Sequence, residues 1–171
     1  MNINIDYLEL IILLIALLIG LLKFSKLDLS NKTFVLYIAF CLFINFTSLL
    51  AIKLFQNNIL IVNACILLDF FILNYLFKTW NLYYKNPKLY LFVNILITVF
   101  FLAESILNHN LFVLNSYSRG FRSFVLVILS IQQINNALFK ETGTFFLKPQ
   151  FLVCIGLIIT HTFTCFISLF L

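Results

Sequence analysis

Charged residues are scarce in this 171-residue sequence, at 10% of the chain, whereas a soluble domain carries roughly one quarter. Hydrophobic residues make up 63%, and the mean hydropathy is +1.10. Such a chain would expose large apolar patches in water and aggregate. The low charge therefore excludes a soluble globular domain and predicts an integral membrane protein.

Glycine and proline are also rare, with four and two copies. Both prolines, Pro87 and Pro149, lie between apolar runs and not inside them. Many secondary transporters interrupt their membrane helices with glycine or proline at the substrate site. The unbroken runs argue against that class of transporter. Because no G-x-x-x-G motif occurs, helix packing must rest on large apolar side chains and interhelical polar contacts.

Metal and cofactor motifs are missing. The sequence has no Cys-x-x-Cys, no His-Glu-x-x-His and no glycine-rich phosphate loop. Its four cysteines fall inside apolar runs, where we interpret them as small packing residues. We therefore expect no metal site, no cofactor and no catalytic residue set.

Six apolar stretches are long enough to cross a bilayer, which takes roughly 18 or more apolar residues. They lie at about residues 7–24, 33–55, 59–77, 89–107, 118–139 and 150–171. The sequence therefore predicts an all-α fold, a polytopic bundle of about six transmembrane helices that forms one domain over residues 1–171. The last run is still apolar at Leu171, which favours a seventh helix beyond the end of this sequence. The alternative is a last helix that finishes at the membrane surface.

Lysine and arginine alternate between the connections. The first, third and fifth connections hold Lys23, Lys26, Lys32, Lys78, Lys85, Lys88, Lys140 and Lys148. The other two hold only Lys53, Arg119 and Arg122. Because lysine and arginine are enriched in cytoplasmic loops, this predicts a protein of the cytoplasmic (inner) membrane with its N-terminus outside. The net charge of +5 reflects topology and not nucleic-acid binding, which needs a basic face.

A single acid, Asp69, lies near the middle of the third apolar run. An ionised carboxylate at the bilayer centre costs about 2.5–3.5 kcal/mol on insertion scales, so we expect it to face the bundle. His161, Asn45 and Ser130 should reach the same depth. One alternative is an Asp69–His161 pair that can hold a proton. The other is a protonated Asp69 that only hydrogen-bonds between helices.

Further polar residues predict which helix is central. Asn63 and Asn74 share one face of the third run at about 100° per residue, and Asp69 lies on another. Polar groups on two faces predict that this helix is surrounded by protein. The aromatic segment "WNLYY" after it fits an interfacial belt on the cytoplasmic side.

Glu104, Arg119 and Arg122 form a second polar cluster near the predicted outer face. We expect an ion pair between Glu104 and Arg122, with Arg119 reaching to the lipid headgroups. The alternative is an outer pocket that faces a ligand.

Three segments, "LLDFFIL", "NSYSRGFRSFVLVILSIQQ" and "KETGTFFLKPQFLVCIGLIITH", resemble a family of small multi-pass membrane proteins of Bacteroidota. These proteins have about seven helices and are often found beside sensor histidine kinases. The resemblance covers most of the chain after about Asn58, and the matching residues are Asp69, Asn115, Ser116, Tyr117 and Pro149. It implies a seventh helix and a sensor histidine kinase, or another membrane protein, as partner. It assigns no activity.

We expect a non-catalytic sensory or accessory module that acts through a membrane or cytoplasmic partner, because the short connections leave no room for a catalytic domain. The alternative is a small proton-coupled transporter or channel that uses Asp69 and His161. An enzyme is not expected, because no acid, base and nucleophile converge on either aqueous face.

The topology makes one test direct. A cysteine introduced in the connection at residues 78–88 should react with a membrane-impermeant thiol reagent only after the cells are permeabilised, because this connection is predicted to face the cytoplasm. Labelling in intact cells would overturn the predicted orientation.

Overall fold

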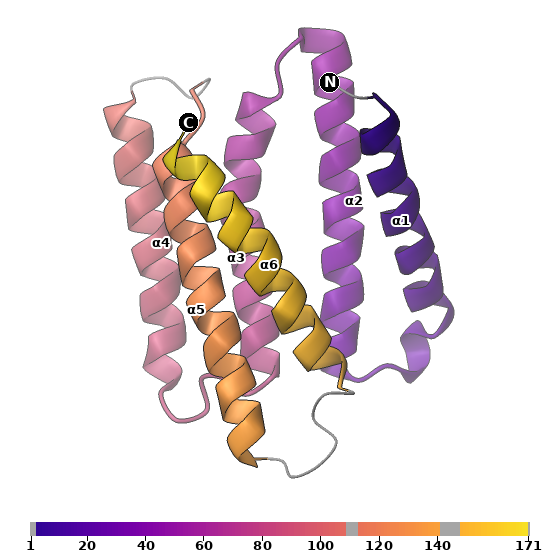
Figure 1. Cartoon of the computed structure of the whole chain (residues 1–171), viewed down its shortest axis with the longest axis vertical. Helices are drawn as coiled ribbons and strands as arrows, with labels where there is room; N and C mark the ends of the chain where they lie inside the picture. The colour runs from indigo at the N-terminus through magenta and orange to yellow at the C-terminus, as the bar shows by residue number, and fades with distance from the viewer. Residues whose placement is uncertain (1–2, 109–112, 141–147, 171) are drawn as a thin grey trace.

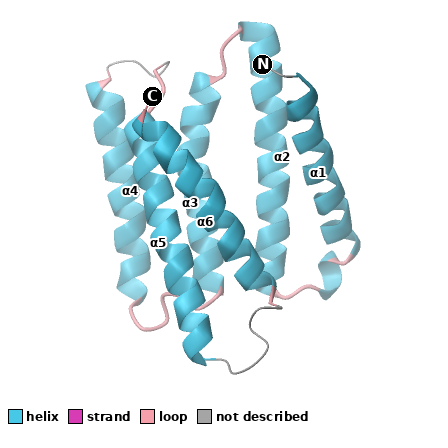
Figure 2. Ribbon diagram, in the orientation of Figure 1, coloured by secondary structure: helices cyan, strands magenta, loops and turns pink. Residues whose placement is uncertain are grey.

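The computed structural model describes residues 3–108, 113–140 and 148–170. Within these ranges every regular element is a helix (Figures 1 and 2). In chain order they are α1 (Ile3–Leu22), a short 3₁₀ helix η1 (Phe24–Lys26), α2 (Leu29–Phe55), α3 (Ile59–Thr79), α4 (Pro87–Leu107), α5 (Ser116–Lys140) and α6 (Pro149–Leu169). The predicted all-α fold is confirmed.

Consecutive helices run antiparallel, so that α1, α3 and α5 descend in Figure 1 while α2, α4 and α6 ascend. In this view α6 crosses in front of α5 and α3, and its most extensive contacts are with α5. The helix α3 contacts α2, α4 and α5, whereas α1 packs chiefly on α2. The centre of the bundle is therefore α3 together with α5.

The lysine pattern of the sequence corresponds to one end of this bundle. In Figure 1 the end of α1, the α3–α4 connection, the end of α5 and the start of α6 lie at the lower end, and the start of α1 and the end of α6 lie at the upper end. We call the lower end, with its lysines, the lysine-rich end. The alternation seen in the sequence is thus a separation of charge between the two ends of one bundle.

The helix ends follow from local chemistry. The helix α2 begins after Asp28, whose carboxylate accepts a hydrogen bond from the Asn31 N–H at 3.3 Å, as an N-cap residue does. It ends at Gln56, which adopts a left-handed conformation with φ of 56°. Pro87 and Pro149 open α4 and α6, where the missing N–H of proline is not needed. The polar breaks in the sequence were therefore correct guides to the connections.

The apolar core is built around the half of α3 nearest the lysine-rich end. Phe70, Leu73, Leu76 and Phe77 are fully buried there, and Leu126 of α5 packs in the same cluster. In the most apolar 18-residue stretch of each helix, 33% of the residues are buried in α3, against 11–22% in α2, α4 and α6. Among these four helices α3 is the most enclosed, as its two polar faces predicted.

Four of the helices, α2, α3, α4 and α6, are long and apolar enough to cross a membrane. The helix α1 contributes a shorter apolar stretch, Leu10–Leu22. The predicted fifth span differs, because α5 is long but not among the four.

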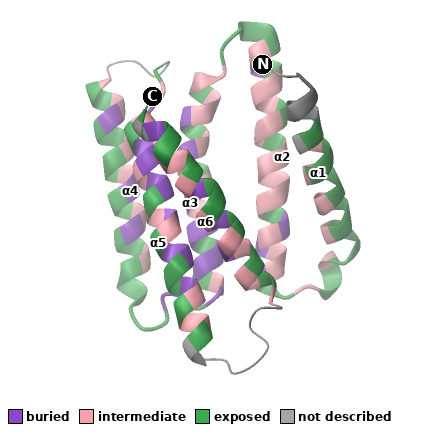
Figure 3. Cartoon of the chain, viewed as in Figure 1, coloured by how far each residue is buried: buried purple, intermediate pink, exposed green. Residues whose placement is uncertain are grey.

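The reason is that α5 contains many polar side chains, several of which lie on its buried face (Figure 3). Its buried polar residues are Ser118, Arg122, Ser123, Ser130 and Gln133. Its exposed large side chains are mostly apolar, namely Tyr117, Phe124, Ile128, Ile131 and Leu138. A helix on the surface of a soluble domain has the reverse arrangement. Much of the polar character of α5 therefore belongs to an interior face, and its outer face is mostly apolar, with Gln132 and Asn135 as exposed polar residues.

A glycine contact between α1 and α2 provides a test of the packing. A Cβ added to Gly20 would lie 2.7 Å from Cγ2 of Val35, whereas a Cβ on Gly156 of α6 would meet nothing within 4 Å. Valine is stiff at χ1 and cannot easily move aside. We expect Gly20→Leu to lower the free energy of unfolding by about 1–3 kcal/mol relative to Gly156→Leu, measured by denaturation in detergent micelles.

The two substitutions gain the same helix propensity, so Gly156→Leu serves as the matched control. Equal stability of both variants would contradict the close approach of α1 to α2.

Candidate functional site

Two charged side chains form an ion pair between α3 and α5. The Nη1 of Arg122 donates a hydrogen bond to Oδ2 of Asp69. The same Nη1 lies 3.5 Å from the carbonyl oxygen of Ile66, one turn earlier on α3. The side chains of Arg122 and Asp69 are only 9% and 16% exposed. The pair therefore joins two central helices through opposite charges that are largely removed from solvent.

This pairing corrects two predictions. The Asp69–His161 pair, one of the two alternatives for the acid, is wrong, because the carboxylate is bound to Arg122. The expected Glu104–Arg122 pair is also wrong, since Glu104 accepts hydrogen bonds from the backbone N–H groups of Tyr117, at 3.1 Å, and Ser118, at 2.6 Å. The first N–H groups of a helix lack intrahelical partners, and a carboxylate placed there is favourable. Glu104 thus caps α5, and Arg122 is left to reach α3.

The surroundings of the ion pair bring in two more helices. Tyr37 of α2 interacts with both Asp69 and Cys41. His161 of α6 is 7% exposed, lies close enough to Arg122 to be affected by its charge, and its Nδ1 has no hydrogen-bond partner among the described residues. The prediction that His161 lies near the buried acid was thus close in place, but its charged neighbour is Arg122. Ser130 instead donates to the Leu126 carbonyl within α5, at 2.8 Å.

A cavity of about 370 Å³ borders the ion pair between α2, α3 and α5. Its polar lining consists of Asn45, Asp69, Arg119 and Arg122. Arg119 therefore faces the cavity together with Arg122, which agrees with the alternative of a pocket at this cluster. Glu104 is not part of the lining. The structure thus brings the predicted buried acid and the two predicted outer arginines into a single site.

Asn63, in contrast, is used to hold the bundle together at the end opposite the lysines. Its Nδ2 donates to the Val113 carbonyl at 2.8 Å, and its Oδ1 accepts from the Asn115 N–H at 3.1 Å. Asn115 in turn donates from Nδ2 to Ser105 Oγ at 2.8 Å. This network ties α3 to the segment that leads into α5 and so fixes where Arg119 and Arg122 begin.

Asn74 has a similar role toward the lysine-rich end. Its Nδ2 donates to Asn94 Oδ1 of α4 at 2.9 Å, and its Oδ1 accepts from the Tyr83 hydroxyl. Burial raises the pKa of the Tyr83 phenol above its ordinary value, so the hydroxyl remains a donor. Asn74 thus joins α3, α4 and the connection between them.

The aromatic segment after α3 corrects the predicted interfacial belt. Trp80 and Tyr83 are 8% and 4% exposed, whereas Tyr84 is 81% exposed. The Trp80 indole N–H donates to Ser30 Oγ of α2, and Gln133 Nε2 of α5 donates to the Trp80 carbonyl at 3.4 Å. A buried tryptophan or tyrosine needs a partner for its polar atom. The polar serine and glutamine on neighbouring helices supply partners that sequence spacing did not reveal.

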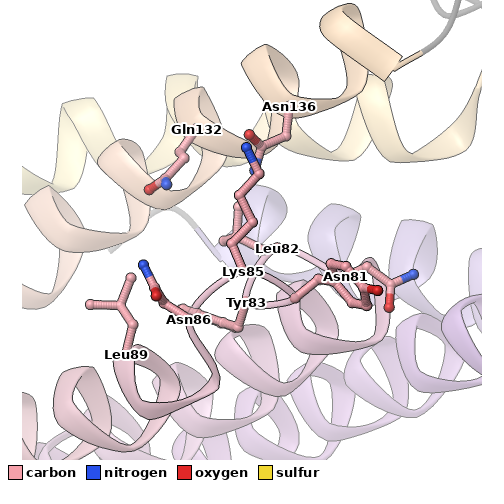
Figure 4. Close-up of a pocket in the computed structure, with 9 residues that line it drawn as sticks. Asn81, Leu82, Tyr83, Lys85, Asn86, Leu89, Gln132 and Asn136 are labelled. Atoms are coloured by element: carbon pink, nitrogen blue, oxygen red, sulfur yellow. The ribbon is translucent and has the colours of Figure 1, made fainter.

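A second cavity, of about 410 Å³, lies at the lysine-rich end between the α3–α4 connection, the start of α4 and the last turns of α5. Four amide side chains and a lysine make its polar lining: Asn81, Asn86, Gln132, Asn136 and Lys85. Figure 4 shows Lys85 extending from the connection toward Asn136 of α5. Sequence reasoning identified the lysines here but not the amides.

The helix α5 links the two cavities. Arg119 and Arg122 line the first cavity from its first two turns, and Gln132 and Asn136 line the second from its later turns. At 1.5 Å per residue, Arg122 and Gln132 are about 15 Å apart along the helix. A rigid displacement of α5 would therefore alter both sites together.

The described residues contain no group of three or more His, Cys, Asp or Glu side chains that could hold a metal ion. The cysteines Cys41, Cys65, Cys154 and Cys165 are free thiols. Comparison with protein-family models, curated proteins and solved structures found no match to this chain.

The ion pair can be tested with a double-mutant cycle. Asp69→Asn leaves Arg122 charged and uncompensated, and removal of one member of a buried pair costs about 3–5 kcal/mol. We expect Asp69→Asn and Arg122→Gln each to lower the free energy of unfolding by about 3 kcal/mol, and the double variant to lose much less than their sum. Denaturation of the purified protein in detergent micelles measures all four proteins.

Arg119→Gln is the control, because it removes a neighbouring guanidinium and leaves the pair intact. Additive losses in the double variant would show that Asp69 and Arg122 do not interact.

Proposed function

We propose that this chain is a non-catalytic integral membrane protein that acts as a sensory or accessory module for a membrane or cytoplasmic partner. The observation that carries the proposal is the cavity lined by the Asp69–Arg122 ion pair, which α5 connects to a second cavity at the lysine-rich end. The first cavity is the input site, and the lysine-rich end is the output site. Neither role requires a chemical reaction.

The bilayer placement rests on the surface of the bundle. Four helices have the length and apolarity to cross a membrane, and α5 exposes mainly apolar side chains while it buries polar ones. An exposed apolar surface of this extent suits lipid and not water. We infer six spans in the cytoplasmic membrane with the N-terminus outside, because the lysines gather at one end of the bundle.

Signal transfer would use the ion pair as the element with two arrangements. A ligand that competes for Arg122 changes how firmly α3 is held to α5, since the pair joins these helices. A ligand shifts such an equilibrium only by its different affinity for the two states. The other contacts of α5, with Glu104 at one end and the Trp80 carbonyl near the other, transmit the change to Gln132 and Asn136.

The proposed partner is a sensor histidine kinase or another membrane protein, as the family resemblance implies. Its contact with this chain would lie at the lysine-rich end, where the second cavity is bordered by the exposed Lys85 and Gln132.

The second candidate is a proton-coupled transporter or channel. The observation that favours it is buried His161, which lies beside Arg122 and whose Nδ1 has no hydrogen-bond partner among the residues that the structure describes. Proteoliposomes with an imposed membrane potential and a pH-sensitive dye separate the two functions. The sensory proposal predicts no proton flux above that of empty liposomes. A flux that His161→Gln abolishes would establish the transporter instead.

The partner contact is tested by site-specific photocrosslinking in cells that produce the protein naturally. A photoreactive residue at Gln132, which is exposed at the second cavity, should give a covalent adduct with a membrane-bound kinase or another membrane protein. The control position is Phe55, which is 76% exposed at the other end of the bundle. Adducts with lipid alone at both positions would contradict the proposal.

A further inference from the structure

The charges around the first cavity do not balance. Arg119 and Arg122 contribute two positive charges to its lining and Asp69 contributes one negative charge. The two guanidinium groups are close enough to repel each other. Among the described residues that line the cavity, Asp69 is the only carboxylate. One of the two positive charges therefore has no counter-charge in the lining.

The hydrogen bonds of the two arginines are also incomplete. The Nε of Arg122 is buried and has no acceptor within the described residues, although the side chain is only 9% exposed. Arg119 is partly buried, and its guanidinium makes no hydrogen bond or ion pair to any residue in the described ranges. Leaving a buried charge or donor unsatisfied is costly. Both arginines therefore have donor capacity to offer to the cavity.

We propose that this cavity binds an oxyanion, a phosphate or carboxylate group held between the guanidinium groups of Arg119 and Arg122. The planar guanidinium matches both groups with two parallel hydrogen bonds. Asp69 keeps Arg122 oriented and leaves the net positive charge available to the ligand. For its role in signalling, this inference rests on the proposed function. It extends that function by naming the chemical class of the input ligand.

The size of the site limits the ligand. A volume of about 370 Å³ lies at the lower end of small-molecule sites. It accommodates one anionic group with a short attached portion, and Ile44, Val62 and Ile66 supply apolar walls for that portion. Two sources carry this chemistry, the headgroup of an anionic lipid and a free phosphate or carboxylate solute.

The test measures the melting temperature of the purified full-length chain in nanodiscs. The reference is a zwitterionic phosphatidylcholine bilayer, compared with the same bilayer plus inorganic phosphate and with one that contains phosphatidylglycerol. Binding to the folded state raises the melting temperature. Arg119→Gln removes one guanidinium without breaking the Asp69–Arg122 pair, and Lys53→Gln removes an exposed cation at the same end of the bundle but outside the cavity.

We expect at least one anion to raise the melting temperature of the parent and of Lys53→Gln. Arg119→Gln should weaken that binding by about tenfold or more, because a hydrogen bond to a charged group is lost. A shift with phosphatidylglycerol alone assigns a lipid headgroup, and a shift with inorganic phosphate assigns a free solute. No shift with either anion, or the same shift in parent and Arg119→Gln, overturns the proposal.

Because no partner protein is present in this measurement, its outcome is independent of signalling. Anion binding with no crosslinked partner would reject the sensory function and retain the site. A crosslinked partner without anion binding would do the opposite.

Discussion

A buried charge needs an opposite charge, and the arrangement of this bundle depends on that requirement. Arg122 and Asp69 lie between its central helices, and each supplies the counter-charge that the other lacks in an apolar setting. The pair requires α5 to lie beside α3 with Arg122 turned inward. Once α5 is held in this way, Ser118, Ser123, Ser130 and Gln133 also face the interior, and most of its exposed large side chains are apolar.

Polar contacts at both ends of α3 support this central pair. Asn63 holds the segment before α5, Glu104 caps the first turn of α5, and Asn74 joins α3 to α4. In lipid no apolar driving force favours one helix neighbour over another, so interhelical hydrogen bonds and close packing select the partners. A few polar residues thus determine which helices pack together, while the apolar outer surface favours a lipid environment.

The sequence was a good guide to the helices and a poor guide to the pairing. Apolar runs and polar breaks located all six helices to within a few residues, because a span must be long and uninterrupted. Depth counting placed Asp69 and His161 at one level, but it contains no information on which way a side chain on another helix points. Arg122 was assigned to Glu104 because both residues lie near the same end of the bundle. The arginine side chain is long, and in the structure it reaches Asp69 on α3 instead. Burial of Trp80 and Tyr83 was missed for a related reason, because their hydrogen-bond partners lie on three different helices that only the fold brings together.

The pairing of Asp69 with Arg122 is tested most directly by infrared difference spectroscopy of the parent against Asp69→Asn at neutral pH. The difference spectrum isolates the vibrations of this one side chain from those of the other acids. If the ion pair exists, the substitution removes an ionised carboxylate band and leaves the protonated carboxyl region unchanged. Loss of a protonated carboxyl band instead would show that Asp69 is a neutral acid and would contradict the ion pair.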